Sequence, residues 1–200
     1  MSPRPLLIAT GNAHKFGEIA VFLENVPWQL MSLRDFPEFD APEENGDSFE
    51  ANALIKAQAY GARFGVACVA DDSGLVVDAL GGAPGIYSAR YAGNGCTDAD
   101  NNEKLLHELR DVADELRSAR FVCCCVLAVP GEMPHMELGT IEGRIARAVS
   151  GKGGFGYDPL FIPNGYDRTF GALVPEVKAS ISHRARAFAK LREYLLRANV

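Results

Sequence analysis

The chain has 200 residues, of which 48% are hydrophobic and 23% charged, and its formal net charge is −6. This composition is typical of a folded globular protein and excludes a disordered chain. The acidic balance excludes the broad basic surface of a DNA- or RNA-binding protein, although a local group of lysines and a metal could still bind a nucleotide. We therefore expect no nucleic-acid partner.

The apolar run at residues 6–9 is too short for the hydrophobic core of a signal peptide, and no segment is long enough to span a membrane. The five cysteines are an odd number, and three are adjacent at 123–125. This pattern fits neither a disulfide framework nor a spaced zinc site. We interpret residues 121–129 as a buried strand with cysteine as a small apolar residue, and a redox role as the weaker alternative. Together these features predict a cytoplasmic protein with no membrane partner.

A short strand and a helix are predicted at the beginning of the chain. Residues 6–9 form the strand, and the turn Thr10-Gly11-Asn12 leads into the helix. The amides at a helix start attract phosphate, and Lys15 adds a positive charge nearby. The alternative is that Thr10 or Asn12 only caps the helix and Lys15 is solvated. The apolar face of this helix consists of Phe16, Ile19, Ala20 and Leu23.

A second helix is predicted over residues 48–63. Asp47 and Glu50 have the spacing of a capping box at its beginning. Asn52 and Lys56 lie one turn apart and so share a face of this helix.

The most informative feature is the pair Asp71-Asp72, which follows the apolar run 66–70. We predict that this run is a buried strand that ends at a loop, where ligands of open α/β sheets bind. Two adjacent carboxylates need a compensating cation, and oxygen ligands suit Mg²⁺. The alternative is a structural turn in which one aspartate is a cap. A metal held by Asp72 would take a further carboxylate from another segment, such as the turn at 43–46.

The second half of the chain continues the alternation of strands and helices, which predicts an α/β fold. We expect Asp98 to cap a helix, residues 138–149 to form a strand broken at Gly143, and residues 151–159 to form a glycine-rich loop. A last helix is expected to begin near Ser182. The buried face of this last helix consists of Phe188, Leu191 and Leu195. The buried face of the helix after Asp98 consists of Leu105, Leu106 and Leu109.

Two groups in this half indicate ligand binding. The loop carries Phe155-Gly156-Tyr157-Asp158, whose aromatic faces can stack on a base while backbone amides select its edge. The alternative is that both rings fill the core. Lys178 and Ser182-His183-Arg184 lie before and at the start of the last helix, where the helix dipole disfavours positive charge. That mismatch is expected if an anion or a carbonyl group of a ligand binds there.

In their order along the chain, these segments resemble the inosine/xanthosine triphosphate pyrophosphatase family. The resemblance spans nearly the whole chain, and no motif position departs from the family pattern. The matching stretches are residues 10–15, 43–46, 49–53, 70–75, 80–91, 153–159 and 178–184.

The resemblance implies a homodimeric α/β protein, with one domain over residues 1–200, a long mixed central sheet flanked by helices, and two lobes around a nucleotide-binding cleft. It also implies Mg²⁺-dependent cleavage of ITP, dITP and XTP to the nucleoside monophosphate and pyrophosphate. Asp72 would be the general base and a metal ligand, with Glu43 as the second ligand and the adjacent Glu44 as the alternative. The triphosphate would be bound by Thr10, Gly11, Asn12, Ala13, His14, Lys15, Ser73 and Lys178. The purine would be bound by Phe155, Gly156, Tyr157 and Asp158, with His183 and Arg184 at its 6-oxygen.

Three alternatives remain at this point. A related pyrophosphatase could act on modified or pyrimidine nucleotides. A receiver-type signalling domain also pairs aspartates at a strand end, but its acidic pair belongs to the first strand. A non-catalytic nucleotide-binding module has little need of a base beside its metal.

Overall fold

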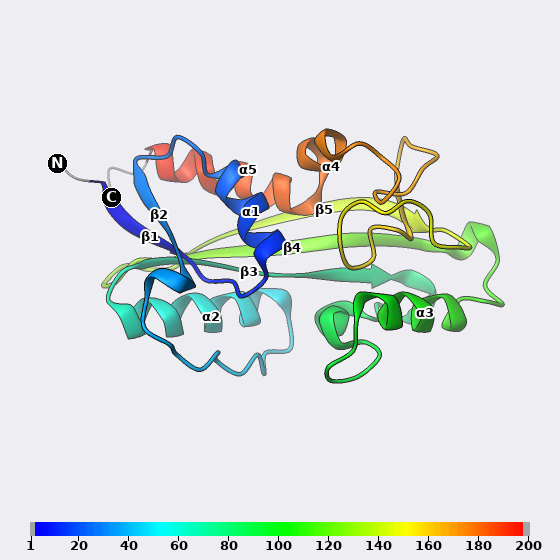
Figure 1. The fold of residues 1–200 in the computed structure, drawn as a ribbon, viewed down its shortest axis with the longest axis horizontal. Coiled ribbons are helices and arrows are strands. Elements are labelled where there is room, and N and C mark those ends of the chain that lie inside the picture. The colour runs from blue at the N-terminus through cyan, green and yellow to red at the C-terminus, as the bar shows by residue number, and fades with distance from the viewer. Residues whose placement is uncertain (1–2, 198–200) are drawn as a thin grey trace. The chain divides into compact units, whose positions relative to one another are not determined.

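A six-stranded mixed sheet organises the chain, whose residues 3–197 are described by a computed structural model. The strand order is β2-β1-β3-β4-β5-β6. Strand β1 pairs in parallel with β2 and β3, whereas β5 and β6 are antiparallel. The predicted α/β class is confirmed (Figure 1). The strands are β1 (Arg4–Ile8), β2 (Trp28–Ser32), β3 (Ala67–Val77), β4 (Ser118–Ala128), β5 (His135–Ile145) and β6 (Phe161–Pro163).

Helices alternate with these strands along the chain. The α-helices are α1 (Ala13–Phe22), α2 (Phe49–Phe64), α3 (Asp98–Glu108), α4 (Pro175–Ile181) and α5 (His183–Arg197). Short 3₁₀ helices cover Leu33–Asp35, Asp78–Leu80, Gly85–Arg90 and Asp114–Leu116. Among the described helices, none has the length and apolar character needed to cross a membrane.

The chain divides into two compact units. Of the described residues, the first unit contains 3–72, 123–139 and 184–197, and the second contains 73–122 and 140–183. Strands β3, β4 and β5 each contribute residues to both units.

In the first unit, the strands bury side chains on both faces. Leu6 and Ile8 of β1 pack in one apolar cluster with α1 and α5, and Leu7 packs in another with α2. Figure 1 shows α1 and α5 on one side of these strands and α2 on the other. This separation follows from the two-residue period of a strand.

The cysteine-containing strand shows the same alternation. Cys123 and Cys125 belong to the cluster with α1 and α5, and Cys124 belongs to the cluster with α2. All three side chains are fully buried and are free thiols. The interpretation of this segment as a core strand is confirmed.

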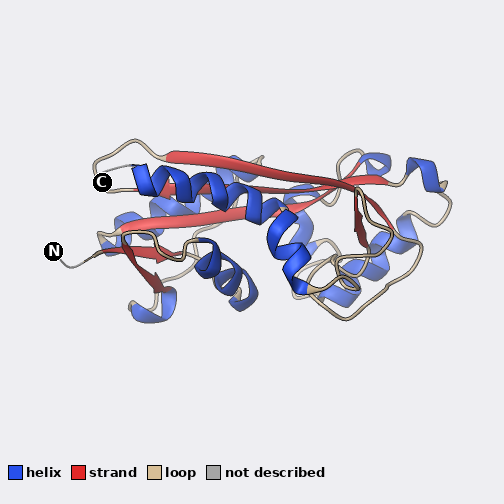
Figure 2. Cartoon of the chain, turned by 90° about the horizontal axis from the view of Figure 1, so that it is seen from above, coloured by secondary structure: helices blue, strands red, loops and turns tan. Residues whose placement is uncertain are grey.

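The second unit has its own core, to which α3 contributes Leu105 and Leu109 and β3 contributes Leu75 and Val77. The buried Arg117 guanidinium donates to the carbonyl oxygens of Leu109, Ile145 and Ala146, and so joins the end of α3 to the end of β5. Between β5 and α4 the chain is mostly loop, interrupted by β6 (Figure 2).

Several predicted boundaries are wrong. Strand β3 does not end at residue 70 but continues through Asp71 and Asp72 to Val77. The first-turn amides of α2 and α3 are capped by Ser48 and Thr97 rather than by Asp47 and Asp98. In both cases the hydroxyl residue lies one position away from the aspartate that we expected.

Two further differences concern the C-terminal half. Strand β5 is continuous through Gly143. A Cβ atom at Gly143 would lie 2.3 Å from the carbonyl oxygen of Ile162, so this glycine admits the neighbouring β6 and does not break the strand. Helix α4, which contains Lys178, was not predicted.

Candidate functional site

The two adjacent aspartates of β3 contact different sets of residues. Asp71 pairs with Lys15 of α1 and Arg184 of α5, whereas Asp72 contacts Asn52 and Lys56 of α2. Successive side chains of a strand point to opposite faces of the sheet. A strand through this pair therefore separates two carboxylates that would repel each other in a shared loop.

Asp71 belongs to a buried network of charges. Its Oδ2 lies 3.2 Å from Lys15 Nζ and 3.3 Å from Arg184 Nη2, and Arg184 Nη1 lies 2.6 Å from Glu18 Oε2. Burial alone would raise the pKa of Asp71, but the Lys15 ammonium and the Arg184 guanidinium outweigh it and hold this pKa well below its usual range. Burial would lower the pKa of Arg184, but the carboxylates of Asp71 and Glu18 raise it. Asp71 and Arg184 thus stabilise each other's charged forms.

Asp72 faces a different environment. Asn52 Nδ2 donates to its Oδ2 over 3.2 Å, and Lys56 Nζ lies 3.6 Å from its Oδ1. Burial raises the pKa of Asp72 despite the opposing effect of Lys56 and Lys15. Asn52 and Lys56 share a helix face as predicted, and this face presents them to Asp72. The carboxyl that we assigned as a base therefore accepts a proton more readily than an ordinary aspartate.

The second carboxylate near Asp72 is Glu44. Its Oε2 lies 3.1 Å from Lys56 Nζ, so one ammonium contacts both acids. Glu43 is exposed. The geometry favours Glu44, the alternative, over Glu43 as the partner of Asp72. Within residues 3–197, no group of three or more histidine, cysteine, aspartate or glutamate side chains is arranged to hold a metal ion.

The turn before α1 is built by local hydrogen bonds. Asn12 Oδ1 accepts from the amides of His14 and Lys15, and the Thr10 hydroxyl accepts from the Asn12 amide. The capping interpretation is correct for Asn12. Lys15 is not merely solvated, because it pairs with Asp71. The remaining predicted residues of the turn, Gly11, Ala13 and His14, are exposed.

In the second unit, Asp158 fixes the beginning of the predicted base-binding loop. Its Oδ2 accepts from the Phe155 amide over 2.9 Å and from Lys178 Nζ over 2.6 Å. Lys178 Nζ also lies 4.4 Å from the centre of the Phe155 ring, within the range of a cation–π contact. The structure thus brings Lys178, which we assigned to the triphosphate, into contact with Phe155 and Asp158 of the predicted base-binding loop.

A glycine is required at the beginning of this loop. Gly154 has a φ of +73°, and a Cβ atom there would lie 2.0 Å from Asp158 Oδ2. A side chain at position 154 would therefore displace the carboxylate that holds Phe155 and Lys178.

Tyr157 lies in the core of the second unit. Its ring is 4% exposed, and its hydroxyl donates to the carbonyl oxygen of Ser88. The alternative that this ring fills the core, which the sequence left open, is therefore correct for Tyr157. Phe155, in contrast, is only half-buried. His183 is buried and stacks on Phe121 with ring centres 4.7 Å apart. Ser73, the residue after Asp72 in β3, is half-buried.

Sequence reasoning missed three residues that hold these groups. Glu18 binds Arg184, and its position one turn after Lys15 was the available signal. Asp98 and Asn102 of α3 each form a hydrogen bond with Gly156. Their one-turn spacing could have suggested a shared face, but nothing in the sequence indicated which loop this face contacts.

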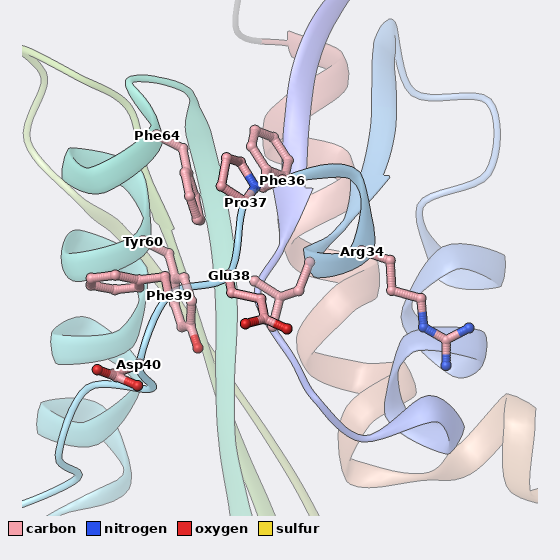
Figure 3. A pocket seen from close by; sticks show the side chains of 9 residues that line it. Arg34, Phe36, Pro37, Glu38, Phe39, Asp40, Tyr60 and Phe64 are labelled. Carbon is pink, nitrogen blue, oxygen red and sulfur yellow. The ribbon is translucent and has the colours of Figure 1, made fainter.

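A separate groove of about 690 Å³ lies in the first unit, over α2 and the segment 33–40 (Figure 3). None of the predicted site residues lines it. Its rings pack against one another, with Phe39 edge-on to Tyr60 at 5.5 Å between ring centres. Phe36 and Phe64 also pack against the apolar cluster that contains Leu7 and the buried residues of α2. This groove therefore lies at the edge of that cluster.

The fold and these contacts define an α/β protein that combines buried carboxylate–lysine pairs with an aromatic, glycine-rich loop. A solved structure, the Staphylococcus aureus Ham1 protein, matches with a TM-score of 0.87 and 39% identity, covering 96% of this chain and 98% of that one. The Ham1 family model matches residues 6–194. The chain therefore belongs to the Ham1 family.

Curated relatives that match nearly the whole chain are named as enzymes. A Geobacter sulfurreducens protein named dITP/XTP pyrophosphatase is 47% identical over 190 residues, which cover 95% of this chain and 96% of the relative. A Nocardia farcinica protein of the same name is 47% identical over 194 residues, which cover 96% of this chain and 94% of the relative.

Proposed function

We propose that this chain hydrolyses the non-canonical purine nucleoside triphosphates ITP, dITP and XTP to the nucleoside monophosphate and pyrophosphate. One observation carries the proposal: relatives named dITP/XTP pyrophosphatase match it at 47% identity over nearly its full length. The contacts of Asp72, Lys15, Lys56 and Phe155 support the same chemistry, because phosphoanhydride hydrolysis needs positive charge for the phosphates and a positioned water.

Mg²⁺ is the proposed cofactor, held by Asp72 and Glu44. This ion is usually bound by one or two carboxylates together with substrate phosphates, so it needs no cage of three protein acids. Both acids already contact one positive charge, the Lys56 ammonium, and so the donor set fits a cation. When bound, the ion would neutralise phosphate charge and polarise the bond to be broken.

Asp72 and Asn52 of the first unit would carry out the hydrolysis. Asp72 would accept a proton from the attacking water. Asn52 would hold the Asp72 carboxylate in place through its hydrogen bond. Lys15, Lys56 and the exposed turn 10–14, together with Ser73 and Lys178, would bind the triphosphate. The bond between the α- and β-phosphates would then break as water adds and pyrophosphate leaves.

The loop of the second unit would select the base. Phe155 is the ring proposed to stack on the purine, and the loop amides, held by Asp158, would contact its edge. His183 and Arg184 would donate to the 6-oxygen of ITP or XTP, with Glu18 and Asp71 fixing the guanidinium. The 6-amino group of ATP is itself a donor and would leave these donors without an acceptor. Such a mismatch can discriminate between substrates by orders of magnitude.

The setting of the enzyme is part of the proposal. Residues 1–200 would work as one catalytic domain. We propose a homodimer in the cytoplasm, with no nucleic-acid or membrane partner. The free thiols of Cys68 and of residues 123–125 suit a reducing compartment.

The proposal is tested by measuring pyrophosphate and orthophosphate release from ITP, dITP, XTP, GTP and ATP, with Mg²⁺ and with EDTA. We expect pyrophosphate from ITP, dITP and XTP, and its loss in EDTA. Orthophosphate would contradict the proposed cleavage position. Binding of these nucleotides without any release would favour the non-catalytic module instead.

A further inference from the structure

Two residues on one face of α3 hold both sides of Gly156. The Gly156 amide donates to Asp98 Oδ2 over 2.6 Å, and Asn102 Nδ2 donates to the Gly156 carbonyl oxygen over 2.9 Å. Residues four apart on a helix lie one above the other. A single helix face thus fixes the peptide groups before and after Gly156.

This contact determines the path of the loop. Gly156 has a φ of +59°, a left-handed conformation that a glycine enters and leaves easily. The loop also borders a cavity of about 460 Å³ lined by Asp98, Asn102 and Phe155. On that side, the two hydrogen bonds from α3 constrain the loop at Gly156. With Asp158 bound to the Phe155 amide, the backbone on each side of Phe155 is fixed.

Stability does not explain the presence of Asn102. The residue is 7% exposed, yet its Oδ1 has no hydrogen-bond partner among the described residues. A buried polar atom without a partner costs free energy. The hydrogen bond that the Asn102 side-chain amide does form is the one to Gly156. We therefore assign Asn102 the role of holding the loop.

Asp98 is likewise not needed as a helix cap. Thr97 and Asp100 form a complete capping box at the beginning of α3. The exposed Asp98, at the first helical position, is therefore available to the Gly156 amide.

We propose that Asp98 and Asn102 are positioning residues for purine selection. They hold the peptide groups of Gly156 so that the Phe155 ring and the loop amides meet the base in one orientation. This inference rests on the proposed function, because it takes the loop to be the part that contacts the base. Neither residue needs to touch the substrate.

The test compares three variants that differ in the atoms offered to Gly156. Asp98→Ala removes the acceptor, Asp98→Asn keeps an acceptor oxygen, and Asn102→Asp replaces the donor by a second oxygen. The matched control is Glu103→Ala, an exposed acid on the same helix. For each protein, kcat and KM are measured with ITP and ATP, together with thermal unfolding and the exchange rate of the Gly156 amide.

We expect Asp98→Ala and Asn102→Asp to raise the KM for ITP about tenfold, the effect of losing one hydrogen bond of a charged or buried group. The value of kcat should stay within about twofold, and the ratio of kcat/KM for ITP over ATP should fall. Asp98→Asn and Glu103→Ala should behave as wild type. Asp98 is exposed, so its alanine variant is expected to remain folded.

An unchanged KM and an unchanged ITP/ATP ratio in a folded, active Asp98→Ala protein would overturn the inference. Equal losses on ITP and ATP would also overturn it. If the wild-type protein cleaves no nucleotide, the proposed function fails separately. Amide exchange then decides whether Asp98 holds the loop: faster exchange of Gly156 in Asp98→Ala supports the positioning, and an unchanged rate contradicts it.

Discussion

The two units hold their candidate functional side chains in different ways. In the first unit, Asp72 and Lys56 project from a strand and a helix, and opposite charges keep them in place. In the second unit, Phe155 lies in a loop, and hydrogen bonds to backbone groups hold it. We infer that charge positions the group proposed as the base, Asp72, whereas backbone geometry positions the ring proposed to stack on the purine, Phe155.

The difference has consequences for what each unit tolerates. A charge pair on regular elements depends on both partners, because a buried charge left alone is costly. A loop held through its backbone depends on conformation, so a glycine with a positive φ matters as well as the side chains that bind its peptide groups. The predictions below test this distinction.

Arg184→Ala should have the largest effect on folding. It removes a fully buried partner of Asp71 and Glu18, and breaking a buried pair costs about 3–5 kcal/mol of unfolding free energy. Urea unfolding measures the loss, with the exposed Arg186→Ala on the same helix as control. A loss no greater than that of the control would show that charge does not hold the first unit together at this point.

Gly154→Ala should act on the loop. The new Cβ would collide with Asp158, and the left-handed backbone would be strained, at a cost of about 1–3 kcal/mol. We expect a KM for ITP raised by about tenfold or more, with a smaller change for Gly153→Ala, whose nearest contact would be 3.3 Å away. Wild-type kinetics in Gly154→Ala would contradict the role of backbone geometry.

Asp71 should make stability depend on pH. Because its folded pKa is lowered from 3.8, its contribution is fully present above the ordinary pKa and is lost as pH falls towards the folded value. In metal-free protein at pH 7, Asp71→Asn should lower the free energy of unfolding, measured with urea, by about 1–3 kcal/mol. Between pH 5 and 3, the variant should lose less stability than wild type. Identical pH slopes for the two proteins would contradict this account, and Asp111→Asn, at an exposed carboxylate, is the control.

The smallest effects are expected at the helix caps. Thr97→Ala in the second unit and Ser48→Ala in the first should each cost about 1 kcal/mol of stability. Thr97→Ala should leave the ITP/ATP ratio unchanged, because Asp98 and Asn102 keep their bonds to Gly156. A changed ratio would mean that the cap, and not the face of α3, positions the loop.

Much of the fold could be predicted because apolar periodicity is a local signal. The strand at 121–129, the buried face of α5 and the shared face of Asn52 and Lys56 all follow from it. The extension of β3 through Asp71-Asp72 could not be predicted, because its charges are compensated by other elements: Lys15 and Arg184 at Asp71, and Lys56 at Asp72. Gly143 was misread for the same reason: the strand that requires it is β6.

The residues of the candidate site also differ in whether a local sequence signal indicates them. Asp72 stood out because a carboxylate after an apolar run is visible in the sequence, and Lys15 and Lys178 stood out because each lies near the beginning of a predicted helix. Tyr157 was ambiguous, since an aromatic residue in a glycine-rich loop can face the core or a ligand. The spacing of Asp98 and Asn102 indicates a shared helix face, but their contact with the loop could not be predicted, because their partner is the backbone of a glycine, which has no side chain to reveal it.

The most direct test of the distinction between the units is kcat/KM for ITP and ATP in Asp72→Asn and Phe155→Ala. Asp72→Asn should lower turnover of both substrates by about 10²–10⁴-fold, the usual contribution of a general base, and leave their ratio unchanged. Phe155→Ala should raise the KM for ITP and change that ratio. A ratio that changes in Asp72→Asn, or one that survives in Phe155→Ala, would contradict the assignment of catalysis to Asp72 and of base selection to the loop of Phe155.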